Sequence, residues 1–338
     1  MADHPMPPKR DLLLPAARLY AHLELPRYGY FLHFCGMNSQ DAWRDAPTVE
    51  CRERFFGHRM RLDLADFFQR IAWFFGCYGE LDVLSAVSCV VRPGDECVDG
   101  GANIGLVTLH MAGCVGGRGG GVVHAFEPGP KPLERLCWHV ERNRLAHVVV
   151  HAEGLSDEPT TLEYKRPGFD NLANGTLGAV PERYGEAVFD RERVRVVRGD
   201  DVIDTRSDRP LFIKLDVEGF EHKALSGFSK VVESRSPAVL LEVNGEMLGA
   251  NGSSPEAVHD ELARLGYAAF ALDRSGFRRR HRLFLHRLTR KQVGYEKDVL
   301  WLRPGTIHWT RAEPHMLDPA RHQYWRHILL ASQGHDIY

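Results

Sequence analysis

The sequence has no cysteine pattern that would bind zinc or build a disulfide framework. Its seven cysteines include no C-x-x-C pair, and several lie in apolar runs, so we expect buried thiols in a reducing cytoplasm. The chain also has no run of about 18 apolar residues and no cationic N-terminal region that leads into an apolar core. We therefore expect neither export nor membrane insertion.

An excess of charge of either sign is also missing. The 338 residues include 43 Lys and Arg against 45 Asp and Glu, which gives a net charge of −2. Without an unbalanced basic stripe there is no electrostatic case for a nucleic-acid partner. The one locally basic run, residues 278–282, is interpreted as a solvated hairpin or loop rather than a phosphate site.

The glycine-rich turn near residue 100 does not have the G-x-G-x-x-G spacing that binds a dinucleotide pyrophosphate. An apolar stretch ends in Asp99, glycines follow at Gly101 and Gly105, and an apolar helical pattern begins after them. A strand that turns into a helix in this way leaves backbone N–H groups open to a ligand. The leading carboxylate would repel a phosphate but suits a ligand that carries an ammonium group.

A second acid, Glu127, ends the next apolar run and can accept hydrogen bonds from both hydroxyls of a ribose. It follows Asp99 by 28 residues, compared with about 20 in a dinucleotide-binding unit. The glycine-rich insert 113–121 can supply the excess as a surface loop. A cationic amino acid joined to an unphosphorylated nucleoside describes S-adenosylmethionine; the alternative is a glycine turn with no ligand.

Four motifs resemble those of the FkbM-type S-adenosylmethionine-dependent methyltransferases, and the resemblance covers about residues 55–303. The motifs are residues 99–105, 125–128, 154–157 and 213–221, the last being the most specific. Gly100 departs from the pattern, since an apolar residue is more usual there, and the insert before Val122 is long. The cofactor-binding residues expected from these motifs are Asp99, Gly100, Gly101, Ala102, Asn103, Gly105, Glu127, Pro128, Ser156 and Asp157.

From residue 93 onward, apolar runs alternate with helical patterns, as in a parallel sheet wound on both faces. The expected strands are 96–99, 122–126, 148–152, 211–216 and 238–243, the expected helices are 104–112, 130–143, 218–233 and 255–265, and 267–273 pairs antiparallel with 298–303. The resemblance implies an α/β fold with the doubly wound, Rossmann-like, seven-stranded sheet of class I methyltransferases.

The chain is expected to have three parts. Residues 1–75 form an aromatic, helical cap, 76–303 the methyltransferase domain, and 304–338 a short C-terminal extension. The first ten residues are rich in proline and charge and are expected to be disordered. The rest of the cap packs on the domain, with a substrate-binding lid as the alternative.

Acidic residues follow most of the expected strands, whose carboxyl ends meet at the edge of the sheet where ligands bind. Methyl transfer needs a positioned acceptor and, for a hydroxyl, removal of its proton. Topology favours Asp216 for this task. His222 is a second candidate base, with Glu218 four residues earlier to orient its imidazole, although a structural His222 is the alternative. Lys214 is expected to pair with Asp216 or a neighbouring acid.

A divalent cation bound by Asp216, Glu242 and Asn244 is a further hypothesis, because such a cation would lower the pKa of an acceptor hydroxyl. Residues 164–197 are expected to form a polar loop over the mouth of the site, which is the edge of the sheet where the strands' carboxyl ends meet. This loop either selects the acceptor or is a mere connection.

These observations predict a cytoplasmic S-adenosylmethionine-dependent O-methyltransferase with a small-molecule acceptor. The resemblance implies a sugar or polyketide hydroxyl of secondary metabolism. The sequence leaves self-association, as a homo-oligomer, open. A non-catalytic scaffold of the same fold and a nicotinamide-dependent oxidoreductase are the alternatives.

Overall fold

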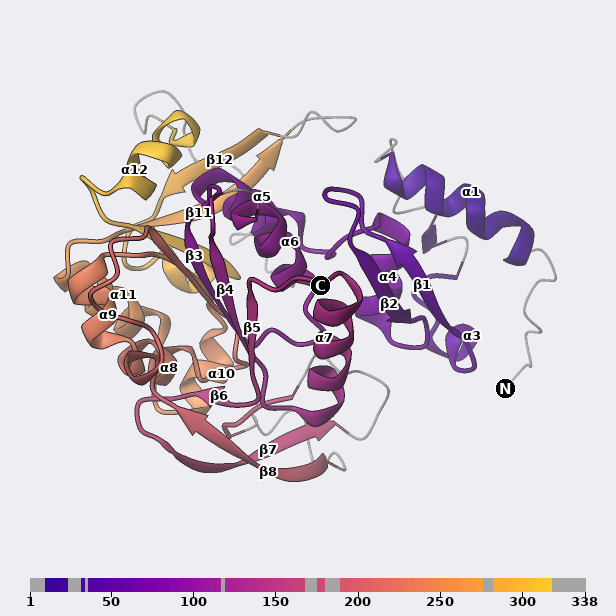
Figure 1. Cartoon of the computed structure of the whole chain (residues 1–338), viewed down its shortest axis with the longest axis horizontal. Helices are drawn as coiled ribbons and strands as arrows, with labels where there is room; N and C mark the ends of the chain where they lie inside the picture. The colour runs from indigo at the N-terminus through magenta and orange to yellow at the C-terminus, as the bar shows by residue number, and fades with distance from the viewer. Residues whose placement is uncertain are drawn as a thin grey trace.

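A computed structural model describes residues 10–23, 32–33, 36–116, 119–167, 175–179, 189–275 and 282–317. Its centre is an eight-stranded sheet in the order β12-β11-β13-β10-β9-β3-β4-β5 (Figure 1). Five of these strands are parallel: β3 (Glu96–Gly100), β4 (Val122–Phe126), β5 (Val148–His151), β9 (Leu211–Leu215) and β10 (Ala238–Glu242). Each lies within a residue of its predicted range.

The sheet closes with antiparallel strands at one side. β13 (Asp298–Leu302) runs antiparallel to β11 (Ala268–Ser275), as predicted, and also to β10. β12 (Arg282–Arg287) adds a further antiparallel strand beside β11, so the sheet has one strand more than the seven expected. Of the basic run 278–282, only Arg282, the first residue of β12, is among the described residues.

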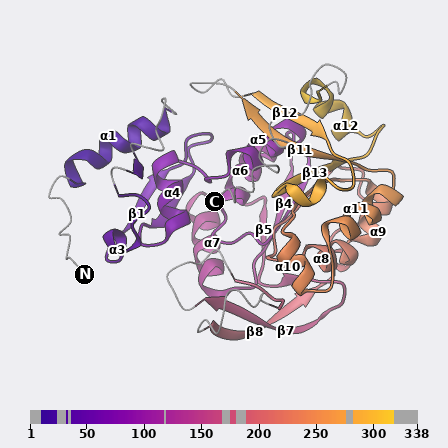
Figure 2. The same cartoon turned by 180° about the vertical axis from the view of Figure 1, so that it is seen from behind.

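Helices cover both faces of the sheet, which confirms the doubly wound fold. α5 (Leu81–Val90), α6 (Leu106–Val115) and α7 (Pro130–Arg142) lie over one face, and α8 (Glu221–Gly227), α9 (Ser229–Arg235), α10 (Gly245–Ala250) and α11 (Pro255–Arg264) over the other (Figure 1, Figure 2). Successive strand residues point to opposite faces. Cys97 and Phe212 accordingly join one buried apolar cluster, while Val98 and Ile213 join the other.

Two predicted helix boundaries need correction. The single helix expected over 218–233 begins only at Glu221 and is divided into α8 and α9. Glu218 and Gly219 have positive φ angles of 52° and 93°, which no α-helix accommodates. In the insert 113–121, α6 continues to Val115, so the loop is shorter than expected.

The polar loop predicted at 164–197 is wrong at both of its ends, where the structure has strands. β7 (Thr160–Pro167) and β8 (Phe189–Val197) form an antiparallel pair, joined by β6 (Gly154–Leu155) into a three-stranded sheet. The buried side chains of Val194 and Val196 alternate with exposed charged ones, which is the pattern of a half-buried strand. Residues 168–174 and 180–188 of the expected acceptor-selecting segment lie outside the described residues.

The N-terminal region is only partly helical, in contrast to the expected helical cap. It combines α1 (Arg10–His22), α3 (Gln40–Trp43) and α4 (Phe67–Phe75) with an antiparallel pair, β1 (Thr48–Arg52) and β2 (Arg59–Asp63). β2 lies against α7, where the backbone N–H of Arg59 donates to Asn143 Oδ1 (2.6 Å) and that of Arg61 to His139 Nε2 (2.8 Å). Residues 1–9 lie outside the described residues.

The C-terminal segment begins with α12 (Ile307–Ala312), which packs on α5. Residues 318–338 are outside the described part of the chain. Within the described residues, no helix combines the length and the apolar character needed to span a bilayer.

Candidate active site

The glycine loop between β3 and α6 has the strand–turn–helix geometry that the sequence predicts. The N–H groups of Gly101 and Ala102 donate to the carbonyl of Phe126 at 3.1 and 2.9 Å. Gly101 has φ +72°, and a Cβ there would lie 1.8 Å from the carbonyl oxygen of Asp216. Gly105, with φ +89°, precedes the first residue of α6. Glycine is therefore required both for the turn and for the close approach of β9.

Glu127 lies at the end of β4 beside this loop. Its side chain is only 5% exposed, Oε2 accepts from the Asn103 N–H (2.8 Å), and Oε1 accepts from the Gly129 N–H (2.7 Å). Burial raises the pKa of this carboxyl to about 7, because these two hydrogen bonds offset only part of the desolvation. The structure thus joins Glu127 to the glycine loop, as expected for a cofactor site.

Asp99 has different partners from those predicted. Its carboxylate is fully buried beneath the loop, where Oδ2 accepts from Thr108 Oγ1 (2.6 Å) and Oδ1 lies 3.1 Å from Lys214 Nζ. A carboxylate in this position cannot also meet an ammonium group on the open side of the loop. The physical reason is Lys214, which is buried in the neighbouring strand and needs a counter-charge.

Lys214 also pairs with Asp216, as predicted, and so connects the glycine loop to this acid. Its ammonium also lies 3.4 Å from Asp216 Oδ2, and its side chain is 5% exposed. Burial would lower the pKa of Lys214, but the charges of Asp99 and Asp216 outweigh it and raise this pKa. One buried cation therefore bridges the ends of β3 and β9.

Three carboxylates meet at the ends of β9 and β10. Oxygen atoms of Asp216, Glu218 and Glu242 all lie within 4.8 Å of one another. Burial would raise the pKa of Asp216, but Lys214, Lys297 and a hydrogen bond from Glu242 bring it below its ordinary value. Burial and the charge of Asp216 raise the pKa of Glu218 to about 8 and that of Glu242 well above its usual range. In this acid trio, the two lysines thus favour the ionised form of Asp216, whereas burial favours the neutral forms of Glu218 and Glu242.

The proposed Glu218–His222 pair is not formed. His222 lies on α8, where Nδ1 is 2.5 Å from Ser253 Oγ and Nε2 is 2.8 Å from Glu261 Oε2. Glu218 precedes the helix in a left-handed conformation, so the two side chains do not share a helical face. Both imidazole nitrogens join α8 to α11 and its preceding turn, which assigns His222 a structural role.

The side chain of Asn244 caps a helix and does not join the acid trio. Its Oδ1 accepts from the N–H groups of Glu246 (3.2 Å) and Met247 (3.1 Å), so it caps the N-terminus of α10. Among the described residues, one cluster of side chains is close enough to hold a metal ion, and it consists of Asp216, Glu218 and Glu242. The predicted cation set is therefore corrected by replacing Asn244 with Glu218.

The motif at 154–157 lies on two sides of the site. Gly154 faces Pro128, since a Cβ on Gly154 would lie 3.5 Å from Pro128 Cγ. Beyond it, Ser156 Oγ donates to Asp157 Oδ1 (2.9 Å), and the carbonyl of Asp157 accepts from Arg198. Within the described residues, the side chains of Ser156 and Asp157 make no hydrogen bond to the glycine loop or to Glu127. Their predicted cofactor role stays a prediction.

Four residues at the mouth were missed by sequence reasoning. Tyr78 donates to Glu80 Oε2 (2.8 Å), Glu80 pairs with Lys297, and Lys297 lies 3.5 Å from Glu242 Oε1. Asp298 begins β13 opposite Glu242, and burial raises its pKa to about 8. For Lys297 and Asp298 a topological signal was available, because the first residue of an antiparallel strand lies at the same edge of the sheet as the last residue of its parallel neighbours.

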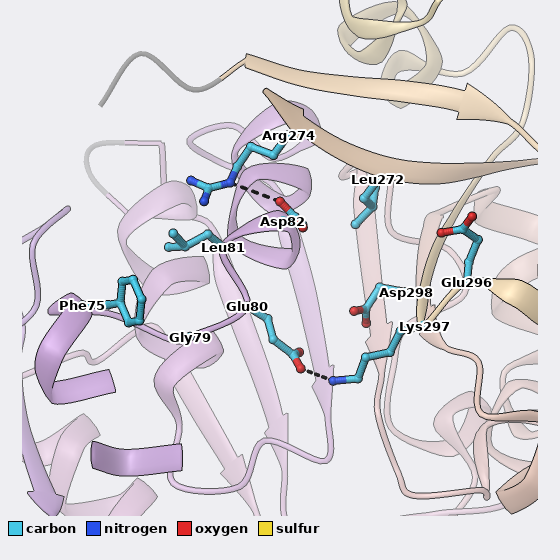
Figure 3. A pocket seen from close by; sticks show the side chains of 10 residues that line it. All are labelled: Phe75, Gly79, Glu80, Leu81, Asp82, Leu272, Arg274, Glu296, Lys297 and Asp298. Atoms are coloured by element: carbon cyan, nitrogen blue, oxygen red, sulfur yellow. Dashed lines mark hydrogen bonds and ion pairs between the residues drawn. The ribbon is translucent and has the colours of Figure 1, made fainter. Parts of the chain in front are cut away.

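A cavity of about 400 Å³ opens beside this network (Figure 3). Phe75, Leu81 and Leu272 provide apolar surface, and the ion pair Asp82–Arg274 lies above the ion pair Glu80–Lys297 in this view. Its volume falls within the range of small-molecule sites, roughly 300–1,000 Å³. Lys297, which lines the cavity, lies 3.5 Å from Glu242, a member of the acid trio that includes Asp216.

The sheet order, the glycine turn and the acids at the strand ends together define an α/β protein of the class I methyltransferase type. The sequence model of the Methyltransferase FkbM domain matches residues 99–269. Because this match covers half of the chain, the protein belongs to the FkbM methyltransferase family. No curated protein matches the sequence significantly.

Solved structures of low sequence identity also match. The methyltransferase FkbM from Methylobacillus flagellatus KT is 16% identical, with a TM-score of 0.38, and the match covers 86% of this chain but 58% of that one. M. jannaschii TYW2 in complex with AdoMet is 14% identical (TM-score 0.37; 76% and 88% covered). A SAM-dependent O-methyltransferase from Thermotoga maritima is 13% identical (TM-score 0.35; 67% and 65% covered). The family assignment rests on the domain match alone.

Proposed function

We propose that the protein transfers the methyl group of S-adenosylmethionine to a hydroxyl of a small molecule. The observation that carries this proposal is the buried Glu127 carboxylate beside the N–H groups of the glycine loop, at the β4 end of the sheet mouth. A carboxylate can accept both hydroxyls of a ribose, whereas a phosphate there would be repelled. Membership in the FkbM family supports the same cofactor.

The acceptor would occupy the cavity of Figure 3 and present its hydroxyl toward Asp216. The oxygen attacks the methyl carbon in line with the sulfonium, the carbon–sulfur bond breaks with its electron pair going to sulfur, and the hydroxyl loses its proton. Asp216 would accept the hydrogen bond of that hydroxyl and then the proton. Lys214 keeps Asp216 ionised, since its ammonium lies 3.4 Å away.

Incubation with methyl-labelled S-adenosylmethionine and a panel of hydroxylated metabolites tests the proposal. We expect label in at least one product, including compounds of the sugar or polyketide type. Binding of S-adenosylhomocysteine without label transfer to any member of the panel would favour a non-catalytic scaffold of the same fold.

Replacing Glu127 by Gln is expected to weaken binding of S-adenosylhomocysteine at least tenfold. The change removes one charge-assisted hydrogen bond to the ribose, worth roughly 1.5–3 kcal/mol when buried. Calorimetry measures the affinity, and urea denaturation checks the fold. The matched control is Glu134→Gln on the exposed surface of α7, for which we expect no change; equal affinities in both variants would show that another group holds the ribose.

The affinity for S-adenosylhomocysteine should also fall about tenfold between pH 8 and pH 6. The pKa of Glu127 in the free protein is raised to about 7 by burial. Ribose hydroxyls donate to the ionised form, so protonation below pH 7 competes with binding. Titrations across this range in the wild type and in Glu127→Gln measure the effect. A slope that persists in the variant would assign it to a different group.

Methyl transfer is expected to be unchanged within about twofold when EDTA is added. The acid trio already has Lys214 and Lys297 within 3.5 Å, so an added cation is not needed to neutralise it. Loss of activity with EDTA and its recovery with magnesium would instead assign Asp216, Glu218 and Glu242 as metal ligands.

A further inference from the structure

A second cavity, of about 410 Å³, shares Leu81 and Arg274 with the cavity of Figure 3. It lies where the N-terminal region meets the methyltransferase domain, between the β1–β2 connection, one face of α5, α6 and the β11–β12 hairpin. Nothing in the proposed methyl transfer uses it.

The two cavities differ sharply in charge. The cavity of Figure 3 is lined by four carboxylates and two cations: Glu80, Asp82, Glu296 and Asp298, with Arg274 and Lys297. Among the described residues that line the second cavity there is no Asp or Glu, and its formal charges come from the guanidiniums of Arg54, Arg92 and Arg274. Like charges around one cavity repel each other, and an anion between them relieves that repulsion.

The three guanidiniums come from separate elements and are fixed in different ways. Arg274 lies 3.2 Å from Asp82, on the wall shared with the first cavity. Arg92, which follows α5, donates to the carbonyls of Ser88 (2.9 Å) and Val91 (2.8 Å). These neutral acceptors orient its guanidinium without cancelling the charge, and Arg92 forms no ion pair within the described residues.

The rest of the lining combines apolar surface with neutral hydrogen-bonding groups. The guanidinium of Arg54 lies 4.9 Å above the ring of Phe55, which is 46% exposed. His110 is 5% exposed and its Nε2 lies 2.8 Å from Ser88 Oγ, while its Nδ1 has no partner among the described residues. Burial lowers the pKa of His110 to about 4, so His110 adds no charge to the cavity at neutral pH.

We propose that this second cavity binds an organic anion, a carboxylate or phosphate ester with an apolar or aromatic body. Guanidiniums form paired hydrogen bonds to such groups, and Phe55 offers a ring face to the body. The anion has two potential sources: the charged end of the acceptor, whose hydroxyl then enters the neighbouring cavity past Leu81, or a separate small molecule. Only the first source rests on the proposed function.

Calorimetry with phenyl phosphate, in the absence of any cofactor, tests the proposal directly. We expect saturable binding that weakens with added salt, and binding of phenol at least tenfold weaker. The double variant Arg54→Gln/Arg92→Gln should bind phenyl phosphate at least tenfold more weakly, and Arg290→Gln, in a surface ion pair with Asp260, should bind it normally. Unaltered urea denaturation of both variants would show that the fold is intact.

Absence of phenyl phosphate binding, or equal binding by the double variant, would overturn the proposal. Because this measurement needs no methyl transfer, it fails or succeeds independently of the proposed function. The source of the anion is distinguished by acceptor pairs with and without a phosphate. If the acceptor supplies the anion, the phosphorylated acceptor has the lower KM, and phenyl phosphate competes with that acceptor. The double variant then raises the KM of the phosphorylated acceptor alone and leaves kcat unchanged. If the anion is a separate molecule, phenyl phosphate changes KM equally for both members.

Discussion

Replacing Asp216 by Asn is expected to reduce turnover by about 10²-fold or more, the usual scale for loss of an acid–base group, while cofactor affinity stays within a few-fold. The carboxylate lies at the carboxyl end of β9, and its pKa is below the ordinary value because Lys214 and Lys297 outweigh its burial. The two lysines therefore favour its ionised form, which can accept a proton. Initial rates with the true acceptor, together with S-adenosylhomocysteine calorimetry, measure both quantities.

His222→Gln is the matched comparison for this variant. Its imidazole contacts Ser253 and Glu261 rather than the acid trio, so turnover should stay within about threefold of the wild type. Full turnover in Asp216→Asn would leave Asp216 without an essential chemical task. A large loss of turnover in His222→Gln with an intact fold would indicate that His222 on α8 is the base.

Replacing Lys214 by Met is expected to destabilise the protein by about 3–5 kcal/mol, the usual cost of removing one partner of a buried ion pair. Asp99 is fully buried and would lose its only cationic neighbour among the described residues. Urea denaturation followed by circular dichroism measures the free energy of unfolding.

Lys297→Met is the control for the stability measurement. Lys297 also contacts two carboxylates, those of Glu80 and Glu242, but its side chain is 56% exposed. Solvent screens such a pair, so its loss should cost about 1 kcal/mol or less. Equal destabilisation by the two substitutions would contradict the view that Lys214 is the structural link between the cofactor loop and Asp216.

The parallel core of the fold could be predicted because each of its signals is local. Strands buried on both faces appear as short apolar runs, and Gly101 with Gly105 marks the turn after β3. β8 was missed because most of its side chains are charged, so the alternation of Val194 and Val196 with charged residues covers too few positions to predict a strand. The break before α8 was missed because Glu218 takes a positive φ, which few residues other than glycine adopt.

The site could be predicted in part, for similar reasons. Glu127 and Asp216 follow apolar strands directly, so topology alone brings them to the mouth. The ion pair between Glu80 and Lys297 joins residues 217 positions apart, and no spacing in the sequence predicts such a contact. Asp99 was interpreted as a ligand-facing acid because the burial of Lys214 next to it becomes visible only when β3 and β9 are paired.

Calorimetric titration of the full chain with S-adenosylhomocysteine, S-adenosylmethionine and a nicotinamide dinucleotide tests the central claim most directly. The account predicts saturable, micromolar binding of both methionine nucleosides, weakened in Glu127→Gln, and no binding of the dinucleotide. Saturable binding of the dinucleotide with none of either methionine nucleoside would contradict it.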